Sequence, residues 1–106
     1  MAQGNIVEME LSASKAKKFL LEITENSSRV FFTRHAEKRM KQRKITRPQI
    51  IRCLQSGAIT EGPARGISGN WEMRMEVLSV GDPVTVVAAL DNDEQGNFVI
   101  VITVIN

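Results

Sequence analysis

The stretch Trp71-Glu72-Met73-Arg74-Met75-Glu76-Val77 alternates between apolar and charged residues along its whole length. Because successive side chains of a β-strand point to opposite faces of the sheet, this alternation predicts a strand with one packed face and one polar face. Trp71, Met73 and Met75 would lie on the packed face, and core packing is the more common role for such residues. The stretch therefore predicts a sheet with one face covered by other elements.

Two apolar runs follow this stretch, over residues 84–90 and 98–105. Both are apolar at consecutive positions, which is typical of strands with neighbours on both sides. We therefore expect two inner strands. The segment Gly81-Asp82-Pro83 predicts a turn before the first run, and the polar segment 91–97 predicts a hairpin loop between the two runs.

Three segments that precede the alternating stretch have helical periodicity, and they cover residues 12–24, 34–43 and about 46–57. Ser12 or Ser14 can cap the first helix, and Thr33 can cap the second. The third helix has the clearest start, because Thr46 and Gln49 form a capping box. These signals predict three helices with defined N-termini.

The remaining segments are shorter. Residues 29–32 are a candidate short strand, residues 58–61 a candidate edge strand, and residues 62–70 a Gly-rich loop. Helices that precede an antiparallel run of strands predict an α+β fold. We therefore expect a single domain over residues 1–106, with N-terminal helices packed on one face of an antiparallel sheet of about three to five strands.

The composition excludes several classes of protein. The 106 residues are 42% hydrophobic and 25% charged, which excludes a disordered chain or a fibre. Cys53 is the single cysteine, so no disulfide forms within the chain, and no Cys/His spacing indicates zinc. We expect no metal and no cofactor. Because no apolar run approaches roughly 20 residues and no secretion signal is visible, we expect a cytoplasmic bacterial protein without membrane contact.

Positive charge is concentrated between residues 34 and 52. This run holds eight of the fourteen basic residues and one acid, Glu37, so its net charge is about +7 and that of the remainder about −5. His35, the only histidine, lies at the start of the run. Positive charge beside a side chain that titrates near neutral pH favours a phosphate-bearing ligand.

One side of the predicted helix 34–43 suits a phosphate. A helix advances about 100° per residue, so His35, Arg39 and Arg43 lie together. His35 falls at the second helical position, where free backbone N–H groups favour an anion. Arginine is a forked donor that suits phosphate oxygens. In a phosphodiester cleavage, His35 would relay a proton while the arginines stabilise the charged transition state.

The basic residues that we expect to contact a nucleic acid are Arg34, Lys38, Arg39, Arg43 and Arg47. Other interpretations fit the same residues. A single histidine near a helix start is commonly a structural hydrogen-bonding residue, and a basic helix face is commonly solvated surface. Arg39 or Arg43 can instead pair with Glu72 or Glu76 of the sheet.

The residues His35-Ala36, Arg39-Met40, Arg43-Lys44-Ile45 and Thr103-Val104 resemble the pattern of a small bacterial family of domains of unknown function. In that family the pattern is His-Ala, Arg-Met, Arg-Gly-Ile and a C-terminal Thr-Val. The resemblance covers about residues 30–105 and leaves residues 1–28 as an N-terminal helical extension. The family is grouped with the RelE/ParE-like toxins in the barnase–EndoU–colicin–RelE class of metal-independent ribonucleases.

The resemblance implies a RelE-like fold, RNA or the ribosome as a target, and an antitoxin-like protein as a partner. It implies His35, Arg39, Arg74 and Thr103 as catalytic candidates. Lys44 replaces the glycine of the family pattern, so we do not expect a left-handed turn there. The chain has no tyrosine and no second histidine, so a second proton carrier would be a glutamate of the sheet or an arginine.

Three interpretations of function are open at this point. The first is a toxin-like protein that binds RNA and cleaves it. The second is a non-enzymatic module on the same fold that binds a nucleic acid or a protein, in which Arg39 matters and His35 does not. The third is a structural domain whose basic helix pairs with its own acidic sheet. The sequence does not indicate an oligomeric state.

Overall fold

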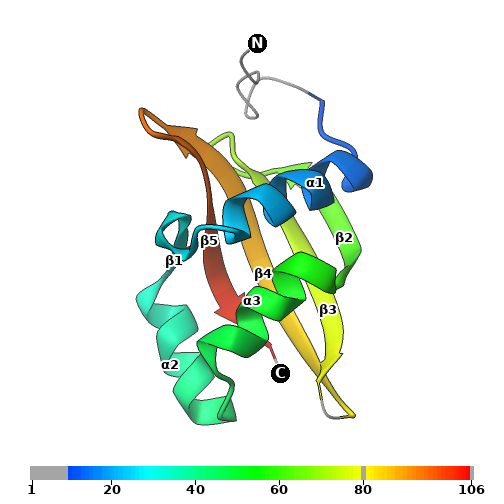
Figure 1. The fold of residues 1–106 in the computed structure, drawn as a ribbon, viewed down its shortest axis with the longest axis vertical. Coiled ribbons are helices and arrows are strands. Elements are labelled where there is room, and N and C mark those ends of the chain that lie inside the picture. Colours follow the sequence, from blue (N-terminus) through cyan, green and yellow to red (C-terminus); the bar gives the residue numbers. More distant parts are fainter. Residues whose placement is uncertain (1–9, 80, 106) are drawn as a thin grey trace.

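The computed structural model describes residues 10–79 and 81–105, and these form an α+β fold (Figure 1). The helices are α1 (Ala13–Thr24), α2 (Arg34–Arg43) and α3 (Arg47–Ser56), and a 3₁₀ turn (Ser27–Arg29) follows α1. The strands are β1 (Val30–Phe32), β2 (Ala58–Arg65), β3 (Trp71–Ser79), β4 (Asp82–Asp93) and β5 (Gly96–Val104).

The described strands form one sheet in the order β1-β5-β4-β3-β2, so the two apolar runs are inner strands, as predicted. Strands β2 to β5 form an antiparallel meander. In contrast, β1 pairs with β5 in parallel, and Phe31 lies opposite Ile100. The antiparallel pairing predicted from the sequence is confirmed for β2 to β5, and the parallel edge strand β1 makes the sheet mixed. The sequence does not reveal this pairing because no hairpin turn joins β1 to β5.

The helices lie on one side of the sheet, where α1 and α3 cross its face and α2 lies beside the end of β5 (Figure 1). Leu20 of α1 and Ile50 of α3 are fully buried in the core. The same core contains Trp71, Met73 and Met75, which are at most 5% exposed, so the face predicted by the alternation is confirmed. None of the described helices is both long enough and apolar enough to cross a membrane.

The helices begin where the caps predict. Ser12 and Thr33 each accept a backbone N–H at the start of α1 and α2. Thr46 and Gln49 form both hydrogen bonds of the capping box at the start of α3. Each cap satisfies N–H groups that have no partner within the first helical turn, which fixes where each helix starts.

Helices α2 and α3 end with different backbone conformations. Lys44 follows α2 with φ 57° and ψ 42°, so the expectation that this turn is not left-handed is wrong. The left-handed residue lets the Ile45 N–H fold back to the Met40 carbonyl oxygen at 2.9 Å. Gly57 follows α3 at φ −73°, where any residue is allowed, but an added Cβ would lie 2.5 Å from the Cys53 carbonyl oxygen. Glycine is needed there for space.

Two loops are shorter than expected. Strand β2 continues to Arg65 through a cis Gly62–Pro63 bond, so the loop covers residues 66–70 rather than 62–70. Strands β4 and β5 extend into the segment 91–97 and leave residues 94 and 95 as the turn. In β2 the pairing with β3 resumes at Ala64 after an irregularity at Gly62 and Pro63, and in the hairpin it continues through polar residues to Asp93 and Gly96. Composition alone does not distinguish such strand ends from loops.

Candidate nucleic-acid interface

Helix α2 is held by a buried stripe and has charged residues on both sides of it. Ala36 and Met40 are the buried residues. At about 100° per residue, the first side carries His35, Arg39 and Arg43, and the second carries Arg34, Glu37, Lys38 and Lys41. We call the first set the His35 side. The two sides face different parts of the molecule and are described separately.

Residues of the α2 region cover the edge of β5 beyond the point where β1 ends. The Thr33 hydroxyl donates to the Ile102 carbonyl oxygen at 2.7 Å, and Arg39 Nε donates to the Val104 carbonyl oxygen at 3.2 Å. These side chains satisfy carbonyl groups that a neighbouring strand would otherwise satisfy. Arg39 is half-buried and therefore has a structural role that the sequence did not predict.

His35 and Arg43 are exposed, and neither makes a side-chain hydrogen bond or ion pair with a described residue. The described part of the chain also contains no ion pair between Arg39 or Arg43 and Glu72 or Glu76. The interpretation in which the basic helix is neutralised by the sheet therefore has no contact to support it. The imidazole and the Arg43 guanidinium are available to a ligand.

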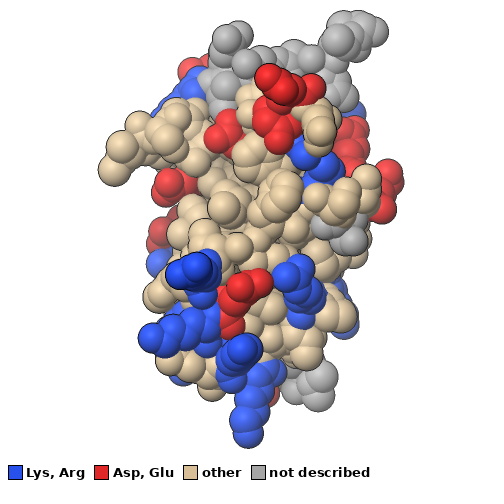
Figure 2. All heavy atoms as spheres, turned by 90° about the vertical axis from the view of Figure 1, so that its left-hand side faces the viewer, with Lys and Arg blue, Asp and Glu red and all other residues tan. Residues whose placement is uncertain are grey.

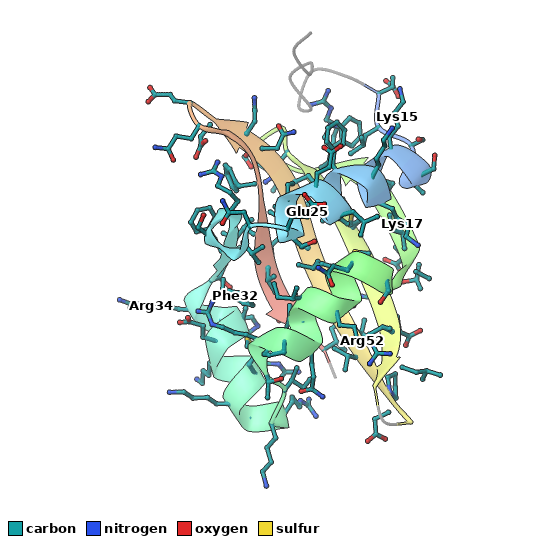
Figure 3. All side chains as sticks on the ribbon, in the orientation of Figure 1. Lys15, Lys17, Glu25, Phe32, Arg34 and Arg52 are labelled. Atoms are coloured by element: carbon teal, nitrogen blue, oxygen red, sulfur yellow. The ribbon has the colours of Figure 1, made fainter. Side chains whose placement is uncertain are left out.

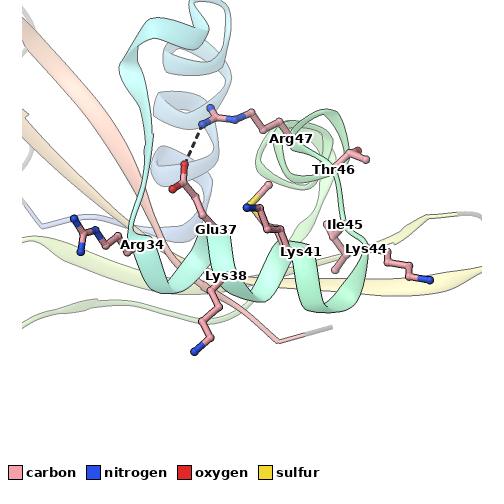
Figure 4. A pocket seen from close by; sticks show the side chains of 9 residues that line it. Arg34, Glu37, Lys38, Lys41, Lys44, Ile45, Thr46 and Arg47 are labelled. Atoms are coloured by element: carbon pink, nitrogen blue, oxygen red, sulfur yellow. Dashed lines mark hydrogen bonds and ion pairs between the residues drawn. The ribbon is translucent and has the colours of Figure 1, made fainter.

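A groove separates the second side of α2 from the start of α3 (Figure 4). Its volume is about 880 Å³, and the lining residues are Arg34, Glu37, Lys38, Met40, Lys41, Lys44, Ile45, Thr46 and Arg47. We call it the α2–α3 groove. Lys and Arg side chains gather at this end of the molecule in Figure 2. Three of the five predicted nucleic-acid contacts, Arg34, Lys38 and Arg47, line this groove, whereas Arg39 and Arg43 do not.

Arg47 connects the α2–α3 groove to β1. Its Nη2 lies 3.4 Å from Glu37 Oε2, and its guanidinium carbon lies 4.4 Å from the centroid of the Phe32 ring. This cation–π contact covers the ring. Figure 3 shows Arg34 pointing into solvent at the start of α2, whereas Lys15 lies far away on α1.

Arg74 and Thr103 lie on the sheet face opposite to the helices. Val87 is opposite Arg74 on β3 and opposite Thr103 on β5, so the two candidates are separated by two strand spacings, about 10 Å. Thr103 directly precedes Val104, and Arg39 donates to the carbonyl oxygen of Val104, so Arg39 reaches the part of β5 that carries Thr103. Arg74 lies farther from α2.

The surroundings of Arg74 are acidic. Its Nη1 lies 3.9 Å from Glu61 Oε2, so its ion-pair partner lies on β2 and not among the glutamates of its own strand, β3. Glu61, Glu72 and Val87 line the same hollow of about 230 Å³. The Arg74 Nε is buried there without a hydrogen-bond partner among the described residues. Arg74 could donate to a ligand, but the carboxylates of Glu61 and Glu72 line the same hollow.

Cys53 lies in the core and is not part of the interface. Burial, and to a smaller extent the nearby Glu76 carboxylate, raise the pKa of the Cys53 thiol to about 12. The thiol is therefore protonated near neutral pH. Among the described residues, no group of three or more His, Cys, Asp and Glu side chains is placed to hold a metal ion.

Lys41 and Lys44 also line the α2–α3 groove, although neither is among the nucleic-acid contacts predicted from the sequence. Lys41 follows Lys38 by three positions, so the helical rule that grouped the His35 side would also have found Lys41. The position of the Lys44 side chain depends on the left-handed turn after α2. The groove itself exists because α3 packs beside α2. No periodicity in the sequence carries that information.

Residues 32–106 match the family described as "Domain of unknown function (DUF4258)". The match contains α2, α3 and the strands from β2 to β5, and α1 lies outside it. Searches of curated proteins and of solved structures found no match.

Proposed function

The chain belongs to the DUF4258 family, whose function is unknown, and we propose that it is a RelE/ParE-like protein that binds RNA and cleaves it without a metal. The RNA lies along α2, with phosphates at the His35 side and at Arg34, Lys38 and Arg47. From the resemblance to RelE/ParE-like toxins, we further propose the ribosome as a target and an antitoxin-like protein as a partner. We propose the cytoplasm as the location.

One observation carries this proposal: an exposed histidine lies at the start of the segment 34–52, whose net charge is about +7. A nucleic acid that contacts such a surface releases counterions, which gives strong binding without sequence preference. Arg43 and His35 have no described side-chain partners, so a phosphate at the His35 side does not have to displace an ion pair. This arrangement supports RNA more than a neutral ligand.

In the proposed reaction, the 2′-hydroxyl of one nucleotide attacks the adjacent phosphorus, and the bond to the 5′-oxygen of the next nucleotide breaks. His35 accepts the proton of the attacking hydroxyl, and water or a second group protonates the leaving oxygen. Arg39 donates to Val104 through its Nε, so its two Nη groups are available to the phosphate. These groups and the guanidinium of Arg43 stabilise the charge on the phosphate. Thr103 contributes a hydroxyl donor.

The surroundings of Arg74 suit a phosphate less well than the His35 side does. Glu61 lies 3.9 Å from Arg74, and Glu72 lines the same hollow. Two carboxylates repel a phosphate at short range. We therefore place the reacting phosphate at α2 and the end of β5, and not over Val87.

The proposal is tested with a labelled single-stranded RNA, by anisotropy for binding and by gel electrophoresis for cleavage. We expect His35→Ala to abolish cleavage and to leave binding nearly unchanged. Arg43→Gln should weaken binding and reduce the slope of log K against log salt by about 0.7. Lys18→Gln changes an exposed lysine of α1 and is the matched control. Binding that is insensitive to salt, or unchanged in Arg43→Gln, would contradict the proposal.

A non-enzymatic RNA-binding module is the second candidate. The chain has one histidine and no tyrosine, and no described side chain contacts His35 as a second proton carrier. Two proton transfers are needed to cleave RNA efficiently at neutral pH. If RNA binds with the expected salt dependence, is not cleaved, and is bound equally by His35→Ala, this second function replaces the first.

A further inference from the structure

We propose that a hollow between β1 and α3 binds one unpaired base of an RNA, with a preference for adenine. Its volume is about 380 Å³, and its lining residues are Val30, Phe32, Arg47, Pro48, Ile51, Arg52 and Gln55. We call it the β1–α3 pocket. This inference rests on the proposed RNA function, because the other nucleotides of the same RNA lie along α2, and it adds a site for a base to the sites for phosphates.

The β1–α3 pocket adjoins the α2–α3 groove, because Arg47 lines both hollows. An RNA backbone whose phosphates contact Lys38 and Arg47 therefore passes beside the pocket. The lining of the groove contains no aromatic ring, so the bases of that RNA have no ring to stack on within the groove. A base that turns away from the groove past Arg47 reaches the pocket.

The pocket presents a stacking surface for this base. The guanidinium carbon of Arg47 lies 4.4 Å from the centroid of the Phe32 ring, on β1 (Phe32 is labelled in Figure 3). Proteins recognise unpaired bases by stacking them on aromatic rings and on guanidinium planes. The Arg47 side chain is 60% exposed, so a base can approach the guanidinium from the solvent side. The base therefore stacks on Arg47, which the ring of Phe32 supports from behind.

The apolar part of the lining is accessible to a ligand. Phe32 and Ile51 are partly exposed and Pro48 is exposed, whereas Val30 is buried. Small-molecule sites have volumes of about 300–1,000 Å³ and are lined mainly by apolar side chains with a few polar groups. At about 380 Å³ the pocket lies at the lower end of this range, which suits one base and not a longer stretch of RNA.

Two polar side chains reach the pocket from the second half of α3. Gln55 is half-buried and Arg52 is exposed, and neither side chain has a hydrogen bond or ion pair with a described residue. A glutamine amide both donates and accepts, which matches the N6 amino group and the N7 atom of adenine. A guanidinium suits a phosphate. Gln55 therefore contacts the edge of the base, and Arg52 contacts the phosphate next to it.

The test compares three ligands of about eight nucleotides and equal charge: 2′-O-methyl oligoadenylate, 2′-O-methyl oligouridylate and an abasic chain. The methyl group blocks the hydroxyl that attacks in the proposed cleavage, so the ligands stay intact. Arg47→Lys keeps the charge and removes the guanidinium plane. Arg34→Lys makes the same change at the exposed start of α2 and is the matched control. Gln55→Leu removes the amide, and melting temperatures establish that the variants are folded.

We expect the wild type to bind the oligoadenylate at least about fivefold more tightly than the abasic chain, which is the gain that stacking of one base supplies. Arg47→Lys should lose most of this difference but keep the salt dependence, because its charge is retained. Arg34→Lys should keep both. The wild type should prefer oligoadenylate to oligouridylate, whereas Gln55→Leu should bind the two alike.

Failure of the base site and failure of the RNA function give different results. Salt-dependent binding with equal affinity for the oligoadenylate and the abasic chain leaves the RNA function in place and overturns the base site. A base preference that is unchanged in both Arg47→Lys and Gln55→Leu also overturns it, because the base then binds elsewhere. If none of the three ligands binds in a salt-dependent manner, the RNA function fails and the base site fails with it.

Discussion

Lys44 adopts a left-handed conformation at the end of α2, with φ 57° and ψ 42°. A side chain with a Cβ is disfavoured there by roughly 1–2 kcal/mol, whereas glycine is not. Part of this gain is lost because glycine makes the unfolded chain more flexible. We therefore expect Lys44→Gly to increase the free energy of unfolding by about 1 kcal/mol, measured by urea denaturation.

The control for this prediction is Lys41→Gly. Lys41 lies within α2, and its substitution removes a cation from the same groove as Lys44→Gly does. Glycine inside a helix is unfavourable, so this variant should lose about 1 kcal/mol. Opposite signs for the two glycine variants would separate backbone conformation from charge. A loss of stability in Lys44→Gly would contradict the left-handed assignment.

At the scale of elements, α2 completes the hydrogen bonding of β5, and Arg39 is part of that contact. Its Nε donates to the Val104 carbonyl oxygen at 3.2 Å. Arg39→Ala removes this donor and leaves the carbonyl group without it, so we expect a loss of about 1–2 kcal/mol in urea denaturation. Arg43→Ala, one turn later at an exposed position, should change stability by less than about 0.5 kcal/mol.

This prediction bears on the interpretation of RNA binding. If Arg39→Ala is as stable as Arg43→Ala, the structural role of Arg39 is wrong and its whole guanidinium is available to a ligand. If it is destabilised as expected, reduced RNA binding by Arg39→Ala does not by itself identify a phosphate contact. Arg43 is therefore the more informative residue of the His35 side.

Arg29 attaches the β4–β5 hairpin to the segment that precedes β1. Its Nη2 lies 2.6 Å from Asp93 Oδ1 and also donates to the Gly96 carbonyl oxygen. The hydrogen bond from Arg29, followed by that from the Gln95 backbone N–H, holds the pKa of the Asp93 carboxyl below its usual value. The ionised carboxylate therefore stabilises the fold above the unfolded pKa of about 3.9. That stabilisation is lost as the pH falls through the lower, folded pKa.

We expect Asp93→Asn to be less stable than the wild type near pH 6, with a difference that shrinks as the pH falls below about 4. Urea denaturation between about pH 6 and pH 2.5 measures this difference. Glu94→Gln removes an acid from the same turn that has no described ion pair, and it is the matched control. A difference that stays constant over this range would show that ionisation of Asp93 is not linked to folding.

For the whole molecule, the sequence predicted the features that depend on neighbours along the chain. The alternation that begins at Trp71 and the caps at Thr33 and Thr46 are local patterns, and the structure confirms the face and the helix starts that they predicted. The parallel pairing of β1, the bond from Arg39 to β5 and the shape of the α2–α3 groove join residues that are distant in sequence. A single sequence contains the residues of such a site, but it does not indicate which of them come into contact in the folded protein.

The position of Cys53 makes the stability of the whole molecule measurable by chemical labelling. The side chain is fully buried in α3, and burial raises its pKa to about 12. A thiol reagent needs an exposed thiolate, so labelling near pH 8 requires the core to open. If the core opens only by global unfolding, the labelling rate follows the free energy of unfolding.

We therefore expect Lys44→Gly to slow the labelling of Cys53 and Arg39→Ala to accelerate it, by about tenfold for each 1.4 kcal/mol of stability. The reaction is followed by mass spectrometry at low urea concentrations, with the fully unfolded protein as the reference rate. Labelling should accelerate with urea in proportion to the equilibrium unfolding constant. A rate that is independent of urea and equal in the two variants would mean that α3 opens locally, without unfolding of the sheet.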